Sequence, residues 1–160
     1  MPLIFRLESK DGIGPYYDVQ STGNFDRDTL SHFIWGGTDR PNHVTPLYDE
    51  TLAYDWCILR ERGREFRRQY YFAFSDLVQF REWFTADDCV KIKQFEYDKF
   101  EYRISIYQMD EKDRFLGDSQ AIFLRDNAVM VGRIDPYDLE DSSNDMKLIN
   151  DNIRWFKNHE

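Results

Sequence analysis

Short apolar segments of two different periods alternate along this chain of 160 residues, and their order limits the fold more than any other feature. A strand with one buried face has an apolar side chain at every second position, whereas a helix has one at every third or fourth. The pattern predicts a strand, a long loop region, a helix, a strand, two helices and three further strands. Because helices separate the strands, we expect a single-domain α+β fold with a mixed or antiparallel sheet.

The strands are predicted from alternation and from aromatic or β-branched runs. They are expected at residues 3–8, 70–74, 100–107, 120–124 and 129–134. The last two runs are joined by Arg125-Asp126-Asn127-Ala128, a polar sequence that predicts a β-hairpin. Residues 16–48 contain glycines and prolines without a sustained period, so we expect a long loop there with one short helix near Leu30–Phe33.

The helices are predicted from capping residues and apolar faces. A first helix is expected to begin at Asp49 or Thr51, since both residue types accept a hydrogen bond from a helix N-terminus. Ser75 is the expected cap of a second helix. Thr85 and Asp88 have the spacing of a capping box, which predicts the start of a third helix.

Residues 135–160 are expected to follow a core domain of residues 1–134 as an acidic segment and a C-terminal helix that packs on the core. Pro136 ends the preceding strand pattern, because proline cannot donate to a sheet ladder. Ser143 is a candidate cap of the final helix. Its amphipathic face is predicted to consist of Met146, Ile149, Ile153 and Phe156.

Composition and charge restrict the class of protein. Aromatic residues make up 17% of the chain and are expected to supply most of the core. The net charge of −9 argues against binding to duplex DNA or to anionic membranes, and no apolar run is long enough to span a bilayer. No signal-peptide pattern is present, and Cys57 and Cys89 are too few for a disulfide framework, so we expect a cytoplasmic protein.

Common catalytic and metal-binding motifs are missing from the sequence. The three histidines, His32, His43 and His159, form no HxxxH or HExxH pair, so a metal site is not expected. The chain also lacks a P-loop, a GxGxxG turn that opens a helix and a GxSxG nucleophile elbow. Common hydrolase and kinase chemistry is therefore excluded at the level of sequence motifs.

Three candidate binding features each leave two interpretations open. Arg6 stands in the first strand, where an arginine needs either an acidic partner or a ligand. His43, near the end of the long loop, is either a surface residue or a catalytic base. A basic cluster is either a solvated turn or a phosphate site. It contains Arg60, Arg62, Arg64, Arg67 and Arg68.

A set of short motifs between residues 3 and 124 resembles a group of small uncharacterised proteins that phages and prophages encode. The resemblance rests on the order of the motifs as a set, and it implies a phage origin without an established activity. The motifs are Phe5-Arg6-Leu7-Glu8, Gly12-x-Gly14-Pro15-Tyr16, His43-x-x-Pro46-x-x-Asp49, Phe72-Ala73-Phe74-Ser75 with Leu77, and Trp83-Phe84.

The same order of residues resembles the ADP-ribosyltransferase fold in its arginine–serine–glutamate class. The resemblance places Arg6 where an arginine on the first strand holds NAD, and Ser75 where a serine supports the nicotinamide pocket. Gln120 stands where that family has its catalytic glutamate, and Asp118 lies two residues before it. An amide carries no charge to stabilise an oxocarbenium-like transition state, so the resemblance implies a nucleotide pocket more than catalysis. Whether the chain is an enzyme stays open.

Two functions follow from these observations. The first is a phage accessory protein, acting in host takeover or against host defence, that binds NAD or a related nucleotide and sequesters it or transfers ADP-ribose weakly. Its cleft would lie between Arg6, His43, Ser75 and Gln120, with Tyr16, Tyr17 and Phe74 stacking on the ring.

The alternative is a non-enzymatic acidic inhibitor of a host defence protein or of a host protein that handles nucleic acid. A negatively charged face would occupy a basic groove in place of DNA phosphates. The candidate carboxylates are Asp135, Asp138, Glu140, Asp141 and Asp145.

Overall fold

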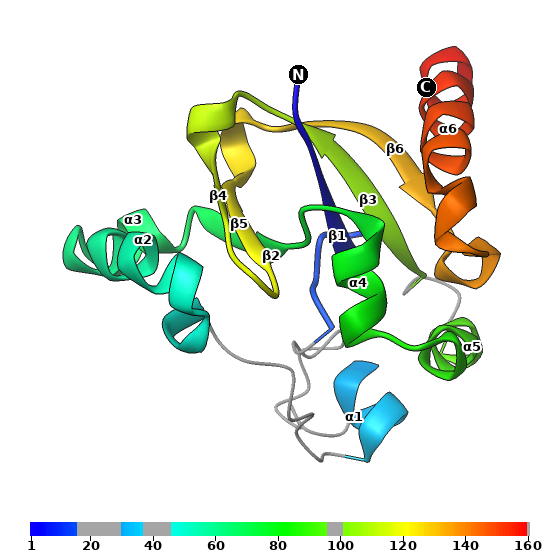
Figure 1. The fold of residues 1–160 in the computed structure, drawn as a ribbon, viewed down its shortest axis with the longest axis horizontal. Helices are drawn as coiled ribbons and strands as arrows, with labels where there is room; N and C mark the ends of the chain where they lie inside the picture. The colour runs from blue at the N-terminus through cyan, green and yellow to red at the C-terminus, as the bar shows by residue number, and fades with distance from the viewer. Residues whose placement is uncertain (16–29, 37–45, 96–100, 160) are drawn as a thin grey trace.

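Two small antiparallel sheets form the centre of the computed structural model, which describes residues 1–15, 30–36, 46–95 and 101–159 (Figure 1). The first sheet has the order β1 (Leu3–Ser9), β3 (Tyr102–Gln108), β6 (Val129–Ile134). The second has the order β2 (Tyr70–Ala73), β5 (Ala121–Leu124), β4 (Arg114–Leu116). A single bridge joins them: the amides of Phe5 and Phe74 donate to each other's carbonyl oxygens over 2.9 and 2.7 Å. The α+β fold class is confirmed, with two antiparallel sheets in place of one sheet.

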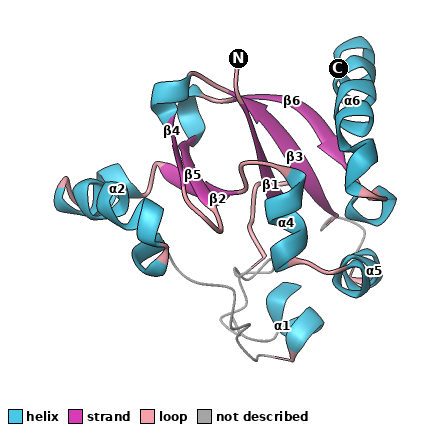
Figure 2. Cartoon of the chain, viewed as in Figure 1, coloured by secondary structure: helices cyan, strands magenta, loops and turns pink. Residues whose placement is uncertain are grey.

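Helices surround the two sheets, with α2 beside the second sheet and α6 beside β6 (Figure 2). Short 3-10 turns connect several of the strands and helices, including one at Arg125–Asn127. The helices of the described residues are α1 (Leu30–Trp35), α2 (Glu50–Glu61), α3 (Arg64–Arg67), α4 (Leu77–Trp83), α5 (Ala86–Gln94) and α6 (Asp145–His159). In this part of the chain, no helix has the length and apolar character needed to cross a membrane.

The starts of α2 and α5 follow the predicted capping chemistry, and the start of α4 does not. Asp49 caps α2, and Thr85 and Asp88 form the predicted capping box at α5. Ser75 does not cap α4; the side chain of Asp76 does, by accepting from the amide of Gln79 over 2.7 Å. The prediction was wrong by one residue because Ser75 instead donates its amide and hydroxyl to the side chain of Gln79.

The predicted hairpin between β5 and β6 is wrong, because the two strands belong to different sheets. Arg125 donates its amide to the carbonyl of Gln69, and Ala128 donates to the carbonyl of Arg125 in a 3-10 turn. Residues 125–128 contain no glycine to supply the positive φ of a tight two-residue hairpin. The observed hairpin joins β4 to β5, where the amide of Gly117 donates to the carbonyl of Gln120 over 2.8 Å.

The register of the first sheet separates its side chains into two faces. Residues paired across antiparallel strands lie on the same face, and Phe5 pairs with Ile106 while Leu7 pairs with Ile104. This apolar face packs in the main core, to which α4, α5 and α6 also contribute. As predicted, the core is rich in aromatic rings; Phe74 alone contacts Phe80, Trp83 and Phe84.

The opposite face of the first sheet, here called the polar face, is turned toward the second sheet. It carries Arg6 and Glu8 on β1 and Ser105 and Tyr107 on β3, all of them buried. Apolar residues between the sheets include Ile4, Ala73, Ala121 and Phe123. Because the second sheet covers the polar face, the charged groups of β1 have to find their partners inside the protein.

The C-terminal helix packs along β6 and contributes Ile149 to the main core. Ile153 and Phe156 are partly buried on the same side of the helix. Met146 differs from the predicted face, since 67% of it is exposed. It lies in the first turn of α6, which begins at Asp145. The predicted cap, Ser143, belongs to the preceding 3-10 turn and donates its amide to Asp141, so that prediction was wrong.

Candidate functional site

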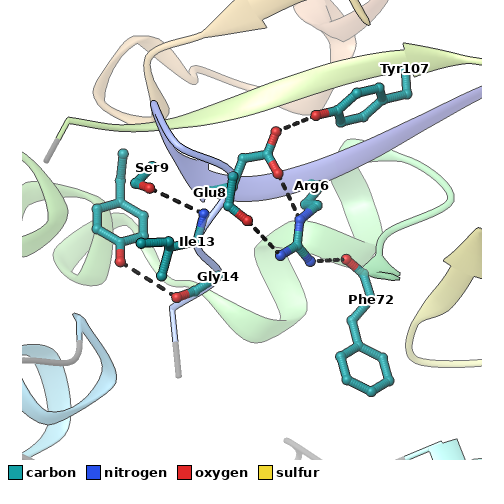
Figure 3. Close-up of polar contacts among 9 residues, drawn as sticks. Arg6, Glu8, Ser9, Ile13, Gly14, Phe72 and Tyr107 are labelled. Atoms are coloured by element: carbon teal, nitrogen blue, oxygen red, sulfur yellow. Dashed lines mark hydrogen bonds and ion pairs between the residues drawn. The ribbon is translucent and has the colours of Figure 1, made fainter. Parts of the chain in front are cut away.

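Arg6 is bound inside the protein by three hydrogen bonds that leave from different nitrogens (Figure 3). Nε donates to Oε2 of Glu8 over 2.7 Å, Nη1 to the carbonyl of Phe72 over 2.7 Å, and Nη2 to the carbonyl of Gly12 over 3.2 Å. The guanidinium carbon also lies 4.8 Å from the centroid of the Tyr71 ring. Of the two interpretations of Arg6, the structure shows the acidic partner, and the side chain ties β1 to β2.

Glu8 is a buried carboxylate with one fixed donor on each oxygen. Arg6 donates to Oε2, and the hydroxyl of Tyr107 donates to Oε1. Burial raises the pKa of the Tyr107 phenol above its usual value of 10.0, and the hydrogen bond to Glu8 raises it further. Each carboxylate oxygen can accept a second hydrogen bond. Glu8 is therefore held in place while part of its acceptor capacity is unused.

A cavity of about 410 Å³ opens beside Glu8, and we call it the Glu8 cavity. Glu8 and Tyr107 come from the polar face of the first sheet, Tyr71 from β2, and Arg125 from the 3-10 turn after β5. Lys10, Asp11, Gly12, Asp126 and Met130 complete the lining. The cavity thus combines a fixed carboxylate, two cations and two aromatic rings in one place.

Arg125 is the cation of the Glu8 cavity whose position is best defined. Its guanidinium carbon lies 4.5 Å from the centroid of the Tyr107 ring, whose centroid lies 5.2 Å from that of Phe123. Its side chain forms no hydrogen bond or ion pair with another residue that the structure describes. The stacking orients the guanidinium, and its N–H donors are available to a ligand.

The residues predicted to form a nucleotide cleft do not gather around Arg6. Ser75 binds Gln79, and Nε2 of Gln79 donates to the carbonyl of Gly117 over 3.2 Å, so Ser75 lies near the β4–β5 turn. That turn contains Asp118, which is exposed, and Gln120, which is buried. The structure thus connects Ser75 to the Asp118–Gln120 turn, while Arg6 is bound to Glu8, Gly12 and Phe72.

The remaining residues of the predicted cleft are aromatic or lie in the long loop. Phe74 is in the main core with 7% of its surface exposed, so it packs against protein rings. Tyr16, Tyr17 and His43 lie outside the described residues.

Asp49 shapes the β4–β5 turn from a distance in the sequence. Its carboxylate accepts hydrogen bonds from the amide of Leu52, from the amide of Asp118, and from the amide and hydroxyl of Ser119. Burial raises the pKa of Asp49, but these hydrogen bonds outweigh it, so the pKa lies below the usual 3.8. The turn that includes two predicted site residues, Asp118 and Gln120, is therefore held by a structural carboxylate.

The acidic segment uses several of its carboxylates within the protein. Asp135 accepts from Lys93 over 2.9 Å, and Asp145 accepts two hydrogen bonds of 2.6 Å from Arg81. Asp141 accepts from the amide of Ser143 over 2.9 Å. These contacts reduce the charge that the segment can present to a basic partner.

The comparisons with known proteins place the chain in a phage family. The model of the family described as Bacteriophage T4 Y00F protein matches residues 1–137. The chain belongs to this family. No curated protein and no solved structure matches the chain.

Membership in the Y00F family confirms the resemblance to phage proteins. Nothing in the comparisons supports the resemblance to ADP-ribosyltransferases. The described residues also contain no group of three or more histidine, cysteine, aspartate or glutamate side chains placed to hold a metal ion.

Sequence reasoning assigned none of the residues that line the Glu8 cavity to a site, and Tyr107 and Arg125 show why. Arg103, Ser105 and Tyr107 alternate along β3 on its polar face. A tyrosine in line with two polar residues could have been recognised in the sequence as a candidate site residue. Arg125 gave no such signal, since it was interpreted as part of a hairpin turn. Arg125 lies in the turn where the chain passes from β5 of the second sheet to β6 of the first sheet, and the sequence does not show that these strands belong to different sheets.

Proposed function

We propose that the protein is a phage accessory protein that binds a small nucleotide in the Glu8 cavity. The observation that carries the proposal is the combination of a buried, anchored carboxylate with an oriented, unpaired guanidinium in one cavity. A nucleotide carries hydrogen-bond donors on its sugar or base and negative charge on its phosphate. The two ends of such a ligand match Glu8 and Arg125 respectively.

The carboxylate of Glu8 favours a ligand with hydrogen-bond donor groups. Arg6 pairs with Glu8 and holds it as an acceptor, and Tyr107 fixes its second oxygen. A ligand hydroxyl or amino group can donate to the remaining lone pairs. Arg6, which the transferase resemblance placed on the ligand, acts here as a positioning residue behind Glu8.

The two cations that line the cavity favour a phosphate. Arg125 offers a planar set of N–H donors, and Lys10 lines the same cavity. The lining also holds three carboxylates, those of Glu8, Asp11 and Asp126. The charges around the cavity balance because Arg6, bound behind Glu8, is a third cation beside Lys10 and Arg125. A cavity without net charge excess selects a ligand with both donors and an anionic group over a purely anionic one.

The size of the cavity and the absence of a charged group at Gln120 restrict the ligand and the reaction that we propose. Small-ligand sites occupy roughly 300–1,000 Å³, and the cavity of about 410 Å³ lies near the lower end of that range. We therefore favour a mononucleotide over a dinucleotide such as NAD. We propose binding without ADP-ribosyl transfer, because Gln120, which the transferase resemblance aligned with the catalytic glutamate, is uncharged and does not line the cavity.

Titration calorimetry with adenosine monophosphate, ADP-ribose and NAD tests the proposal. We expect heat on binding and a raised melting temperature with the mononucleotide. Arg125→Gln should weaken binding roughly 10–100-fold, since it removes charge-assisted hydrogen bonds.

Arg62→Gln is the matched control, because Arg62 also stacks on an aromatic ring, at 5.1 Å from Phe66, away from the cavity. It should bind as the wild type does. No heat and no change in melting temperature at millimolar ligand would show that the cavity does not serve nucleotides.

A further inference from the structure

A row of polar residues crosses the first sheet next to the Glu8 cavity. Arg6 on β1 pairs with Ser105 on β3, and Ser105 pairs with Arg133 on β6. Paired residues of antiparallel strands have their side chains on the same face, so all three belong to the polar face. Tyr107, two residues from Ser105 on the same face of β3, lines the Glu8 cavity. The row therefore adjoins the cavity within the same layer of the molecule.

Two members of this row have polar atoms without a hydrogen-bond partner among the residues that the structure describes. The hydroxyl of Ser105 is buried and has no hydrogen-bond partner in the described part of the chain, and Ser105 as a whole is 0% exposed. Nε and Nη2 of Arg133 are also buried without a partner. An unsatisfied buried donor costs about 1–3 kcal/mol, and more when the group is charged. Such groups are uncommon in native proteins and call for an explanation.

The other arginines of the polar face, Arg6 and Arg103, each lie next to a glutamate. Arg6 pairs with Glu8 at 2.7 Å, and Arg103 lies 3.6 Å from Glu101. Arg133 has no ion pair with any residue in the described part of the chain. The protein carries 30 acidic residues against 21 basic ones, so a half-buried arginine without an acidic partner is unexpected.

We infer that Arg133 and Ser105 form a binding site for an oxyanion, a phosphate or carboxylate group. A guanidinium and a hydroxyl both donate to oxyanions, and the anion would also neutralise the charge of Arg133, which a water molecule would not do. The group can come from a free anion or from a ligand that extends out of the neighbouring Glu8 cavity. The inference rests on the unpartnered donors and does not require the proposed nucleotide function.

Inorganic phosphate is the first probe. We expect phosphate to raise the melting temperature of the wild-type protein relative to chloride of equal ionic strength. Arg133→Gln should lose this response and weaken phosphate binding by about tenfold or more in calorimetry. Arg154→Gln is the control, because Arg154 is an exposed arginine of α6 with only a long contact of 4.0 Å to Asp151. It should respond as the wild type does.

Ser105→Ala keeps the test decisive if Arg133→Gln does not fold. In chloride it should be as stable as the wild type or more stable, because it removes an unpartnered hydroxyl. In phosphate it should gain less than the wild type gains. An equal response to phosphate in the wild type and Ser105→Ala, or no response in the wild type, would overturn the inference.

A nucleoside and its monophosphate identify the source of the anion. If the ligand of the Glu8 cavity supplies it, Arg133→Gln should weaken binding of the monophosphate and leave the nucleoside unchanged. If phosphate alone binds through Arg133 while neither nucleoside nor nucleotide binds, the oxyanion site stands and the proposed nucleotide function fails. Phosphate binding that does not depend on Arg133 contradicts the site in either case.

Discussion

At the scale of single residues, Asp49 shows how much one carboxylate can organise. It caps α2 through the amide of Leu52 and holds the β4–β5 turn through Asp118 and Ser119. Gly117 fits against it, because a Cβ at that position would come within 2.5 Å of Oδ2 of Asp49. The sequence predicted Asp49 as a helix start from local chemistry. Its second role spans about 70 residues and has no local signature.

The pH dependence of stability tests Asp49. Its pKa in the fold is below the usual 3.8, so its stabilising contribution is complete above that pH and declines as the pH falls below 3.8 toward the folded value. Asp49→Asn should cost about 2–3 kcal/mol at neutral pH, since an amide cannot accept all of these hydrogen bonds. Urea unfolding at several pH values measures the difference between wild type and variant. The difference should shrink in acid, and a constant difference would contradict the assignment.

At the scale of elements, α6 acts as a cover for the free edge of β6. Oδ1 of Asn152 accepts from the amide of Arg133 over 2.9 Å, and Nδ2 donates to its carbonyl over 2.6 Å. The side-chain amide thus takes the place of a neighbouring strand, which protects an edge that could otherwise pair with another chain. Gly132 leaves room for this contact, because a Cβ there would lie 2.4 Å from Oδ1 of Asn152.

A double-mutant cycle tests the docking of α6. Gly132→Ala should cost about 1–3 kcal/mol in a wild-type background, because the new methyl displaces Asn152. In an Asn152→Ala background the same change should cost less, since the clashing oxygen is gone. Denaturant unfolding of the four proteins gives the coupling energy. Equal costs in both backgrounds would show that Gly132 is needed for another reason, such as the side chain of Ile106, which would lie 3.1 Å from a Cβ at position 132.

Elements with local signals were the ones that sequence reasoning could predict. The capping box at Thr85 and Asp88 involves residues three apart, and α5 begins where it was expected. The β5–β6 hairpin failed because two adjacent strands can equally well belong to different sheets. Alternation alone does not say which strands pair, so the division into two sheets could not be predicted.

At the scale of the whole molecule, the candidate site could be predicted only in part for the same reason. Arg6 was correctly expected to need an acid or a ligand, because a buried arginine requires a partner. Glu8 and Tyr107 contact each other beside a cavity because the second sheet covers the polar face, and the sequence does not show this arrangement. The Glu8 cavity is a product of the contact between the two sheets, and no single segment encodes it.

Arg6 contributes a polar link between the two sheets. Besides the bridge between Phe5 and Phe74, Arg6 links β1 to β2 through the carbonyl of Phe72. Arg6→Ala should therefore cost about 3–5 kcal/mol, because it leaves Glu8 buried without its cation. Ser75→Ala is the control and should cost less than about 1 kcal/mol, since the amide of Ser75 still binds Gln79.

Urea unfolding followed by circular dichroism and by tryptophan fluorescence measures both costs. The wild type should give coincident transitions, and Arg6→Ala should separate them if the sheets lose their coupling. Trp83 reports on the main core and Trp56 on the outer side of the second sheet, where its ring centroid lies 5.7 Å from that of Phe72. A cost below 1 kcal/mol for Arg6→Ala would show that Glu8 does not depend on this pair, and the positioning role of Arg6 would then be wrong.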